Sequence, residues 1–263
     1  MTSDPARDLD LILETAREAG ALAMALREGG LDVAWKEGDS PVTNADLAAD
    51  ALIRQRLAAA RPDYGWLSEE TADSPERLGK RRLFVVDPID GTRAFLKGRP
   101  WWSVSIAVVE DGQPTAGAVF APQLDEAYAA RIGGGASLNG APIRAAATAS
   151  LEDCAMIGDP RMFSHPAWPS PWPPMRVASR SSTAYRMCLV AAGAADAALA
   201  LVSKADWDLA AADLIAREAG AFVGDHRGRP FAYNAPQPAQ ASLLCATQSL
   251  APLIMERVRH IAI

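Results

Sequence analysis

The string DPIDGT at residues 87–92 places two carboxylates, a glycine and a hydroxyl close together. Residues 83–86 form an apolar run that suits a buried strand, so Asp87 would stand at the end of that strand. Carboxylates there, beside a helical turn at residues 93–96, can hold a hard cation and offer N–H groups to phosphate oxygens. Asp-Pro and Asp-Gly alone form ordinary turns, but the whole string after a hydrophobic strand favours phosphoryl-transfer chemistry.

Other acids stand at the ends of predicted elements. Glu69 and Glu70 close a short apolar stretch, and Asp208 opens a predicted helix. Asp46 has capping-box spacing in the first turn of another helix. Taken singly, paired acids are typical of a solvated surface and an acid at a helix start is typical of a cap. If these acids are buried together they repel one another unless cations neutralise them, so their gathering predicts a metal site that can activate water.

The elements that must position these acids differ between the two parts of the chain. Asp4 and Pro5 predict a long helix that ends near Gly29, and a second helix is predicted to end at residue 61. Residues 71–82 are predicted to be an exposed connection, and the Pro/Trp-rich residues 165–174 a loop. The remaining predicted strands cover residues 104–109, 116–120, 126–130, 176–178, 198–202, 221–223 and 242–246, and the remaining helices cover residues 182–192, 208–219 and the C-terminus.

This order of elements predicts an α+β N-terminal half, residues 1–145, and an α/β C-terminal half, residues 146–263, joined through small residues at 145–150. The N-terminal half would carry most of the metal ligands. The C-terminal half would supply Asp208 and the side of the pocket that receives the leaving group.

Composition narrows the class of protein. The chain has 263 residues, 49% of them hydrophobic, and a formal net charge of -6, so it suits a folded enzyme and offers no basic footprint for a nucleic acid polymer or an anionic membrane. Its three cysteines form no CxxC pair, and no apolar run is long enough for a membrane span. The N-terminus does not look like a signal peptide, and we expect a cytoplasmic protein.

Together these motifs resemble the inositol monophosphatase superfamily. The paired Glu69-Glu70, the DPIDGT string and WDLAA at residues 207–211 match its three signatures in the family's order, and the likeness runs from the first helix almost to the C-terminus. The resemblance implies an α+β fold, a layered α-β-α-β-α sandwich of the inositol monophosphatase and sugar phosphatase type. It also implies an Mg²⁺-dependent phosphoric monoester hydrolase that acts on a small soluble phosphate ester.

The resemblance further implies a set of metal ligands. Glu69, Asp87 and the carbonyl of Ile89 would hold one Mg²⁺, and Asp87, Asp90 and Asp208 would hold a second. The active site would contain two or three ions in all. Oxygen ligands of this kind are those that Mg²⁺ prefers. Two such ions can stabilise the attacking and the leaving oxygen of an in-line displacement together.

Roles for residues beside the metal follow from the same resemblance. Asp46 and Thr92 would orient the attacking water, and the amides of Gly91 and Thr92 would face the phosphate. Glu69 would act in catalysis as well as in metal binding, Asp208 would also contact the substrate, and Glu70 would lie outside the ligand shell. The resemblance also implies inhibition by Li⁺ and allows a homodimer.

The sequence leaves three substrates open. Inositol monophosphatases usually carry an acid seven places before the WD aspartate, where this chain has Leu201. Residues 36–43 and 93–97 look more like the bacterial branch that removes the 3′-phosphate of 3′-phosphoadenosine 5′-phosphate, whereas DGTRAF at residues 90–95 is similar to histidinol-phosphate phosphatases. We rank the 3′(2′),5′-bisphosphate nucleotidase first, inositol monophosphatase second and histidinol-phosphate phosphatase third.

Two cations suggest where a second anionic group of the substrate would bind. Lys204 lies four residues before Asp208, and Arg180 is predicted to open the preceding helix. A guanidinium can hold a phosphate through two hydrogen bonds and an ammonium can act as a point charge. The alternative is that both are solvated, as most Lys and Arg are.

Other phosphatase chemistries fit the sequence less well. Haloacid-dehalogenase phosphatases separate their two acids by one residue, but Asp87 and Asp90 are separated by two. A cysteine phosphatase needs an Arg six places after its nucleophile, where Cys188 is followed by Ala194. There is no GxxxxGK[ST] loop, and the histidines form no ligand-spaced cluster. A non-catalytic binding module on the same fold remains an alternative of another class.

Overall fold

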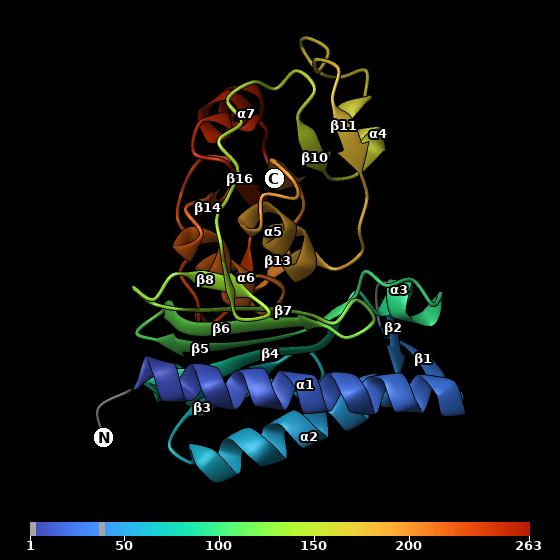
Figure 1. The fold of residues 1–263 in the computed structure, drawn as a ribbon, viewed down its shortest axis with the longest axis vertical. Helices are drawn as coiled ribbons and strands as arrows, with labels where there is room; N and C mark the ends of the chain where they lie inside the picture. The colour runs from blue at the N-terminus through green and yellow to red at the C-terminus, as the bar shows by residue number, and fades with distance from the viewer. Residues whose placement is uncertain (1–3, 37–39) are drawn as a thin grey trace.

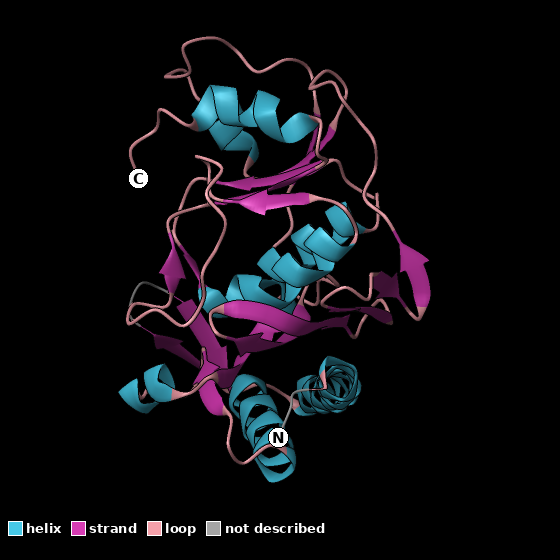
Figure 2. Ribbon diagram, turned by 90° about the vertical axis from the view of Figure 1, so that its left-hand side faces the viewer, coloured by secondary structure: helices cyan, strands magenta, loops and turns pink. Residues whose placement is uncertain are grey.

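The computed structural model describes residues 4–36 and 40–263, and it is built in five layers (Figure 1). Helices α1 and α2 lie on one face of a seven-stranded sheet, α5 and α6 lie between this sheet and a five-stranded sheet, and α7 covers the far side. Figure 2 shows the same stack of helices and strands from the side. The predicted α-β-α-β-α sandwich is therefore confirmed.

The described elements run in the following order. The helices are α1 (Pro5–Gly29), α2 (Asn44–Ala60), the 3₁₀ helix η1 (Pro75–Gly79), α3 (Thr92–Leu96), α4 (Pro160–Phe163), α5 (Thr183–Ala191), α6 (Asp206–Glu218) and α7 (Leu250–Val258). The strands are β1 (Val33–Lys36), β2 (Ser40–Thr43), β3 (Gly65–Ser68), β4 (Arg82–Asp90), β5 (Ser103–Glu110), β6 (Gln113–Ala121), β7 (Glu126–Arg131), β8 (Ala136–Leu138), β9 (Ala141–Ile143), β10 (Ala155–Ile157), β11 (Arg176–Ala178), β12 (Ala197–Ala200), β13 (Lys204–Ala205), β14 (Phe222–Gly224), β15 (Ala239–Gln240) and β16 (Leu243–Ala246).

The large sheet has its strands in the order β3-β4-β5-β6-β7-β8-β9. Only its edge pair β3 and β4 is parallel, and Ser68 of β3 lies opposite Val86 of β4. The carboxyl ends of two parallel strands meet at the same edge of the sheet. Glu69 and Asp87 follow the paired residues Ser68 and Val86 and therefore lie side by side. The strand continues to Asp90, so Asp87 lies within β4 and not, as predicted, at its end.

Three hydrophobic cores fill the spaces between the layers. Side chains alternate across a strand, so Phe84 and Val86 pack against α1 and α2, whereas Leu83 and Val85 pack toward α5 and α6. A third core joins the five-stranded sheet to α7. Because helices cover both faces, β4 and β5 are buried along almost their whole length.

The prediction for residues 71–82 was only partly right. This segment contains η1, and its Arg77 is only 2% exposed. The Arg77 guanidinium binds Asp73 at 2.6 Å and Asn234 at 2.7 Å, so it ties this connection to the C-terminal half. A buried cation needs such partners, and those from the distant part of the chain cannot be read from local sequence.

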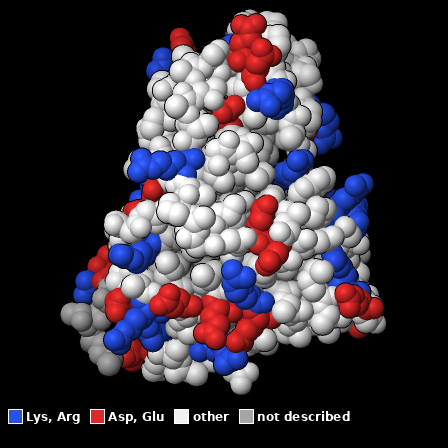
Figure 3. Space-filling model, viewed as in Figure 1, with Lys and Arg blue, Asp and Glu red and all other residues white. Residues whose placement is uncertain are grey.

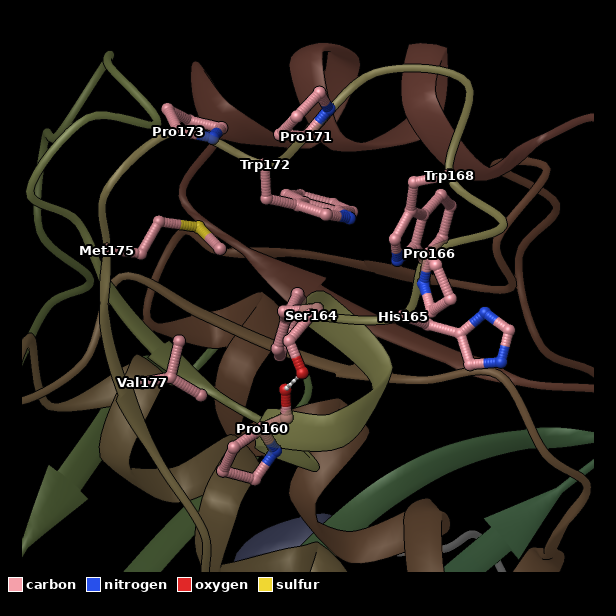
Figure 4. Close-up of a pocket in the computed structure, with 11 residues that line it drawn as sticks. Pro160, Ser164, His165, Pro166, Trp168, Pro171, Trp172, Pro173, Met175 and Val177 are labelled. Carbon is pink, nitrogen blue, oxygen red and sulfur yellow. Dashed lines mark hydrogen bonds between the residues drawn. The ribbon is translucent and has the colours of Figure 1, made fainter.

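Residues 165–174 form no helix or strand, as predicted, but they pack on their own aromatic side chains. The ring of Trp172 makes edge contacts with Phe163 and Trp168, and the Trp168 indole N–H donates to the Met162 carbonyl at 2.6 Å. Figure 4 shows Trp168, Trp172 and several prolines around a cavity of about 460 Å³. Packing of this kind explains how a long loop can keep one shape.

Some boundaries differ from the predictions. The hairpin of β1 and β2 was not predicted, and residues 37–39, which belong to the compared string 36–43, lie outside the described residues. Helix α6 begins at Asp206, two residues before the predicted start, so Asp208 lies in its first turn. Helix α5 begins at Thr183 with Ser182 as its N-cap, so Arg180 does not open it.

The described surface agrees with the composition. Figure 3 shows acidic and basic side chains interspersed on the viewed face, with no broad basic field there. Within residues 4–36 and 40–263, no helix combines the length and the apolar character that a bilayer span needs.

Candidate active site

A break in the pairing of β4 brings two acids to one side of the sheet. Residues three apart on a regular strand face opposite sides. Here Asp87 lies opposite Ser105 and Asp90 opposite Ser103, so three steps along β4 match two along β5. The extra residue is a β-bulge. Since Ser103 and Ser105 share a face, both carboxylates point the same way.

Helix α6 adds the third acid. Asp208 lies in its first turn, and carboxylate oxygens of Asp87, Asp90 and Asp208 all lie within 4.8 Å of one another. Asp206, two residues earlier, accepts hydrogen bonds from the Asn234 amide at 3.0 Å and the Gln240 side chain at 2.9 Å. These contacts fix the start of the helix, whose N-terminal dipole also favours an anion.

The electrostatics of this cluster favour a cation. Burial raises the pKa of Asp87 well above its usual range, and the charges of Glu69, Asp90 and Asp208 raise it further. Burial, followed by the charge of Asp90, raises the pKa of Asp208 to about 7. Oxygen donors that are buried, anionic and this close fit a hard cation such as Mg²⁺, which would relieve their repulsion.

The Glu69–Glu70 pair lies beside this cluster. Both carboxylates bind Lys36, whose ammonium lies 3.3 Å from Glu69 and 2.6 Å from Glu70. Burial is the main cause that raises the pKa of Glu70 to about 7, although Lys36 opposes it. Lys36 comes from the unpredicted hairpin, so its contact with the pair could not be foreseen from spacing.

Asp46 and Thr92 meet as the resemblance implies. The Thr92 hydroxyl lies 3.2 Å from Asp46 Oδ1 and 3.1 Å from the carbonyl of Ile89, so its single proton can be donated to either. The other oxygen of Asp46 accepts the amide and the hydroxyl of Thr43, which caps α2. Burial raises the pKa of Asp46, and the Thr43 donors oppose this.

Gly91 allows the chain to turn within this site. Its φ is +96°, and a Cβ there would lie 3.0 Å from the Ser182 amide nitrogen and 3.1 Å from the Trp101 carbonyl. Only glycine tolerates both the left-handed backbone and so close an approach. The same residue is the N-cap of α3, and Thr92, the first residue of that helix, contacts Asp46.

Asp90 also connects the two halves of the chain. Its carboxylate accepts the Ser182 hydroxyl at 2.6 Å and the amides of Thr183 at 3.0 Å and Ala184 at 2.6 Å. An anion at the first N–H groups of a helix stabilises that helix. Burial raises the pKa of Asp90, and these donors oppose it.

A cavity of about 450 Å³ is lined by the charged residues Asp159, Arg161, Arg186 and Lys204 and by Leu201, among others. Lys204 is close enough to lower the pKa of Asp208, although burial dominates there. The Arg186 guanidinium donates to the carbonyl of Arg180 at 2.6 Å and to that of Ser181 at 3.4 Å. Burial lowers the Arg186 pKa, and Asp90 and Asp208 oppose this.

Sequence reasoning missed Arg186. Its one signal was a single cation within the apolar helix TAYRMCLVA. Arg180, which was predicted to face the substrate, is not among the residues that line this cavity. Its guanidinium stacks on the Trp101 ring, 4.2 Å from the ring centroid, and donates to the Ser179 carbonyl.

Comparison with known proteins identifies the family of this chain. A model of the inositol monophosphatase family matches residues 5–262. The chain belongs to this family. Its members are metal-dependent phosphatases, so the chain is a phosphoric monoester hydrolase.

Relatives within the inositol monophosphatase family carry different substrate names. The chain is 36% identical to a histidinol-phosphatase of Chlorobaculum parvum, over 84% of this chain and 87% of that protein. It is 32% identical to the 3′(2′),5′-bisphosphate nucleotidase CysQ of Salmonella typhimurium, over 86% of this chain and 94% of that protein. It is also 32% identical to an inositol-1-monophosphatase of Rhizobium meliloti, over 96% of each.

Solved structures give the same family fold. The suhB protein of Bartonella henselae superposes with a TM-score of 0.83 at 26% identity, over 97% of this chain and all of that chain. An IMPase of Thermotoga maritima superposes with a TM-score of 0.82 at 29% identity, over 96% of this chain and 97% of that one. The fold predicted from the signatures is therefore the fold of the family.

Proposed function

We propose that this phosphatase removes the 3′-phosphate of 3′-phosphoadenosine 5′-phosphate to give AMP. The observation that carries the proposal is the cavity that Lys204 and Arg186 line, since the charge of each of these cations interacts with that of Asp208. Among the described residues, neither forms an ion pair within 4.0 Å. Both side chains are partly exposed, and Asp90, Asp208 and Asp159 act on Arg186 without forming an ion pair with it, so an anionic group of the substrate would gain direct partners here.

The cluster of acids would hold Mg²⁺. Asp87, Asp90, Asp208, Glu69 and the carbonyl of Ile89 are the ligands we assign to two or three ions. Bound there, Mg²⁺ supplies positive charge to the phosphate oxygens and lowers the pKa of a water molecule. The protein's own part is to hold these oxygens rigidly, through the bulge of β4 and the fixed start of α6.

Side chains beside the metal would position the nucleophile. Asp46 accepts a hydrogen bond from Thr92, and together they would orient a water molecule toward phosphorus. As that water attacks, its oxygen would bond to phosphorus and give up a proton, the ester P–O bond would break, and the leaving 3′ oxygen would take up a proton. The N–H groups of Gly91 and Thr92, at the start of α3, would face the phosphate oxygens because the first N–H groups of a helix have no partner within it.

Histidinol phosphate is the second candidate substrate. The relatives at 36% identity are histidinol-phosphatases from two organisms, and this favours histidinol phosphate over inositol phosphate. The cavity also has Leu201 on its wall, which offers no acceptor to a ring hydroxyl. Inositol 1-phosphate thus falls from second to third, while the two unpaired cations keep the bisphosphate nucleotide first.

Phosphate release from three substrates, measured with and without Mg²⁺, tests the proposal. We expect the highest kcat/KM with 3′-phosphoadenosine 5′-phosphate, less with histidinol phosphate and least with inositol 1-phosphate. Faster hydrolysis of either alternative would overturn the substrate assignment. Absence of release from all three, in protein that binds Mg²⁺, would mean that the chain acts on another phosphate ester.

Further properties follow from family membership and stay expectations. We expect Li⁺ to inhibit phosphate release, and retention of activity in millimolar Li⁺ would place the chain among less sensitive members. A cytoplasmic location also stays an expectation. The family allows a homodimer, and light scattering would measure the mass of the particle in solution. The division into residues 1–145 and 146–263 stays a prediction that expression of each half would test.

A further inference from the structure

A buried carboxylate outside the acid cluster lies behind the Glu69–Glu70 pair. Asp50 is on α2, one turn after Asp46, and is only 7% exposed. One of its oxygens accepts the hydroxyl of Ser68, and the other accepts the hydroxyl of Thr71 at 2.6 Å. These two donors come directly before and directly after the glutamate pair.

The chemistry of this contact requires an acid. An ionised carboxylate only accepts hydrogen bonds, so both hydroxyls must donate to it, one to each oxygen. An amide would offer a single acceptor oxygen. Among the described residues Asp50 has no cation within 4.0 Å, so its burial costs free energy that only these donors offset.

The turn that Asp50 holds has little other support. Residues 69–71 belong to no strand or helix. The Glu69 amide donates to the Val86 carbonyl at 3.2 Å, and the Glu70 amide lies 3.4 Å from the Ser68 hydroxyl. Lys36 contacts the glutamate side chains from the hairpin. The two hydroxyl contacts therefore close the turn against α2.

We infer that Asp50 is a positioning residue that fixes the Glu69–Glu70 turn and thereby sets the affinity of the site for Mg²⁺. The inference rests on the proposed role of Glu69 as a ligand. Residues that hydrogen-bond behind metal ligands commonly change metal affinity 10–100-fold when they are removed. Because Asp46 and Asp50 lie one turn apart, α2 would orient the water-positioning pair and the glutamate pair as one rigid unit.

Calorimetric titration of the intact chain with Mg²⁺ tests this inference without any substrate. Asp50→Ala should raise the Kd for Mg²⁺ by roughly tenfold or more, and Asp50→Asn, which keeps one acceptor, should raise it less. Asp196→Ala is a matched control. Asp196 is also 7% exposed and accepts a threonine hydroxyl, that of Thr148 at 2.7 Å, but it lies in the C-terminal half.

The control separates positioning from general stability. Asp196→Ala should lower the Tm and leave the Kd for Mg²⁺ unchanged. An unchanged Kd in Asp50→Ala, with a loss of Tm like that of the control, would reduce Asp50 to a structural role and overturn the inference. Should Asp50→Ala not fold, Ser68→Ala and Thr71→Val each remove one donor and should each raise the Kd.

The outcomes also separate this inference from the proposed function. Wild-type protein that binds Mg²⁺ but prefers another phosphate ester would overturn only the substrate assignment. Wild-type protein that binds no Mg²⁺ would overturn the metal site and this inference together.

Discussion

The hydroxyl of Thr92 lies 3.2 Å from the carboxylate of Asp46, although the two residues are 46 positions apart in the chain. Asp46 is fixed by the capping box of α2, in which Thr43 and Asp46 each bind the other's backbone amide. Thr92 is fixed by the turn at Gly91 and by the nearby carbonyl of Ile89. Each member of the pair is thus held by its own local structure, which suits a pair that must orient a water molecule.

Thr92→Ala should lower kcat far more than it changes KM, because it removes an interaction needed for attack and not for substrate binding. The expected loss is on the order of 10²-fold, the lower range for general acid–base contributions. Thr92→Ser, which keeps the hydroxyl, is the control and should retain most activity. Steady-state phosphate release measures both, and a phosphorylated enzyme trapped during turnover would contradict attack by water.

Asp87→Asn and Asp208→Asn should each abolish phosphate release while the fold is kept. Each change removes an anionic metal ligand with almost no change of volume. Circular dichroism would check the fold, and metal analysis after gel filtration would check the loss of Mg²⁺. Near-normal turnover in both folded variants would refute the assignment of the metal ligands.

Removal of metal should make stability depend on pH through Asp208. Burial, and next the charge of Asp90, raises the pKa of Asp208 to about 7 in the folded chain, against the usual 3.8. Between these values the unfolded chain loses its proton first, so this group lowers the free energy of unfolding as pH rises. This decrease in the free energy of unfolding should level off above about pH 7, where Asp208 is ionised in both the folded and the unfolded chain.

Asp208→Asn, which cannot titrate, isolates this contribution. In a chelator, the Tm of this variant should exceed that of the wild type by a margin that grows from about pH 5 to about pH 7. Saturating Mg²⁺ should reverse the order, because the ion stabilises only the chain that binds it. A margin that does not change with pH would show that Asp208 is not held near its neighbours.

The cavity cations should discriminate between substrates. Lys204→Ala and Arg186→Ala should each weaken binding of 3′-phosphoadenosine 5′-phosphate by about 1–3 kcal/mol, as expected for hydrogen bonds to charged groups. Neither change should weaken the binding of a simple monophosphate to that extent. Equal losses on both substrates would mean that these residues act on the shared phosphate.

Arg180→Ala tests the cation that the sequence favoured. Because the Arg180 guanidinium stacks on Trp101 and does not line the cavity, we expect this variant to lose less affinity for 3′-phosphoadenosine 5′-phosphate than Arg186→Ala does. Competition binding of AMP to all three variants would measure the contribution of the second anionic group alone. A larger loss of affinity in Arg180→Ala than in Arg186→Ala would support the prediction from sequence that Arg180 binds the second anionic group.

Local sequence determined much of this protein. The capping residues Asp4 and Thr43 set the starts of α1 and α2, and apolar periodicity predicted the strands that carry the acids. The three signatures predicted the family, which the match over residues 5–262 confirms. These features depend on neighbours a few residues apart, where capping and side-chain alternation act, and so they can be read along the chain.

Tertiary structure alone decided the arrangement within the site. The bulge that turns Asp87 and Asp90 to one side exists only because β4 pairs with β5. The cavity is lined by Arg186 and not by Arg180. Helix α5, which carries Arg186, begins after Ser182, where Asp90 binds its first residues from another part of the chain. Such contacts join residues far apart in sequence, and their geometry depends on packing that no single segment contains.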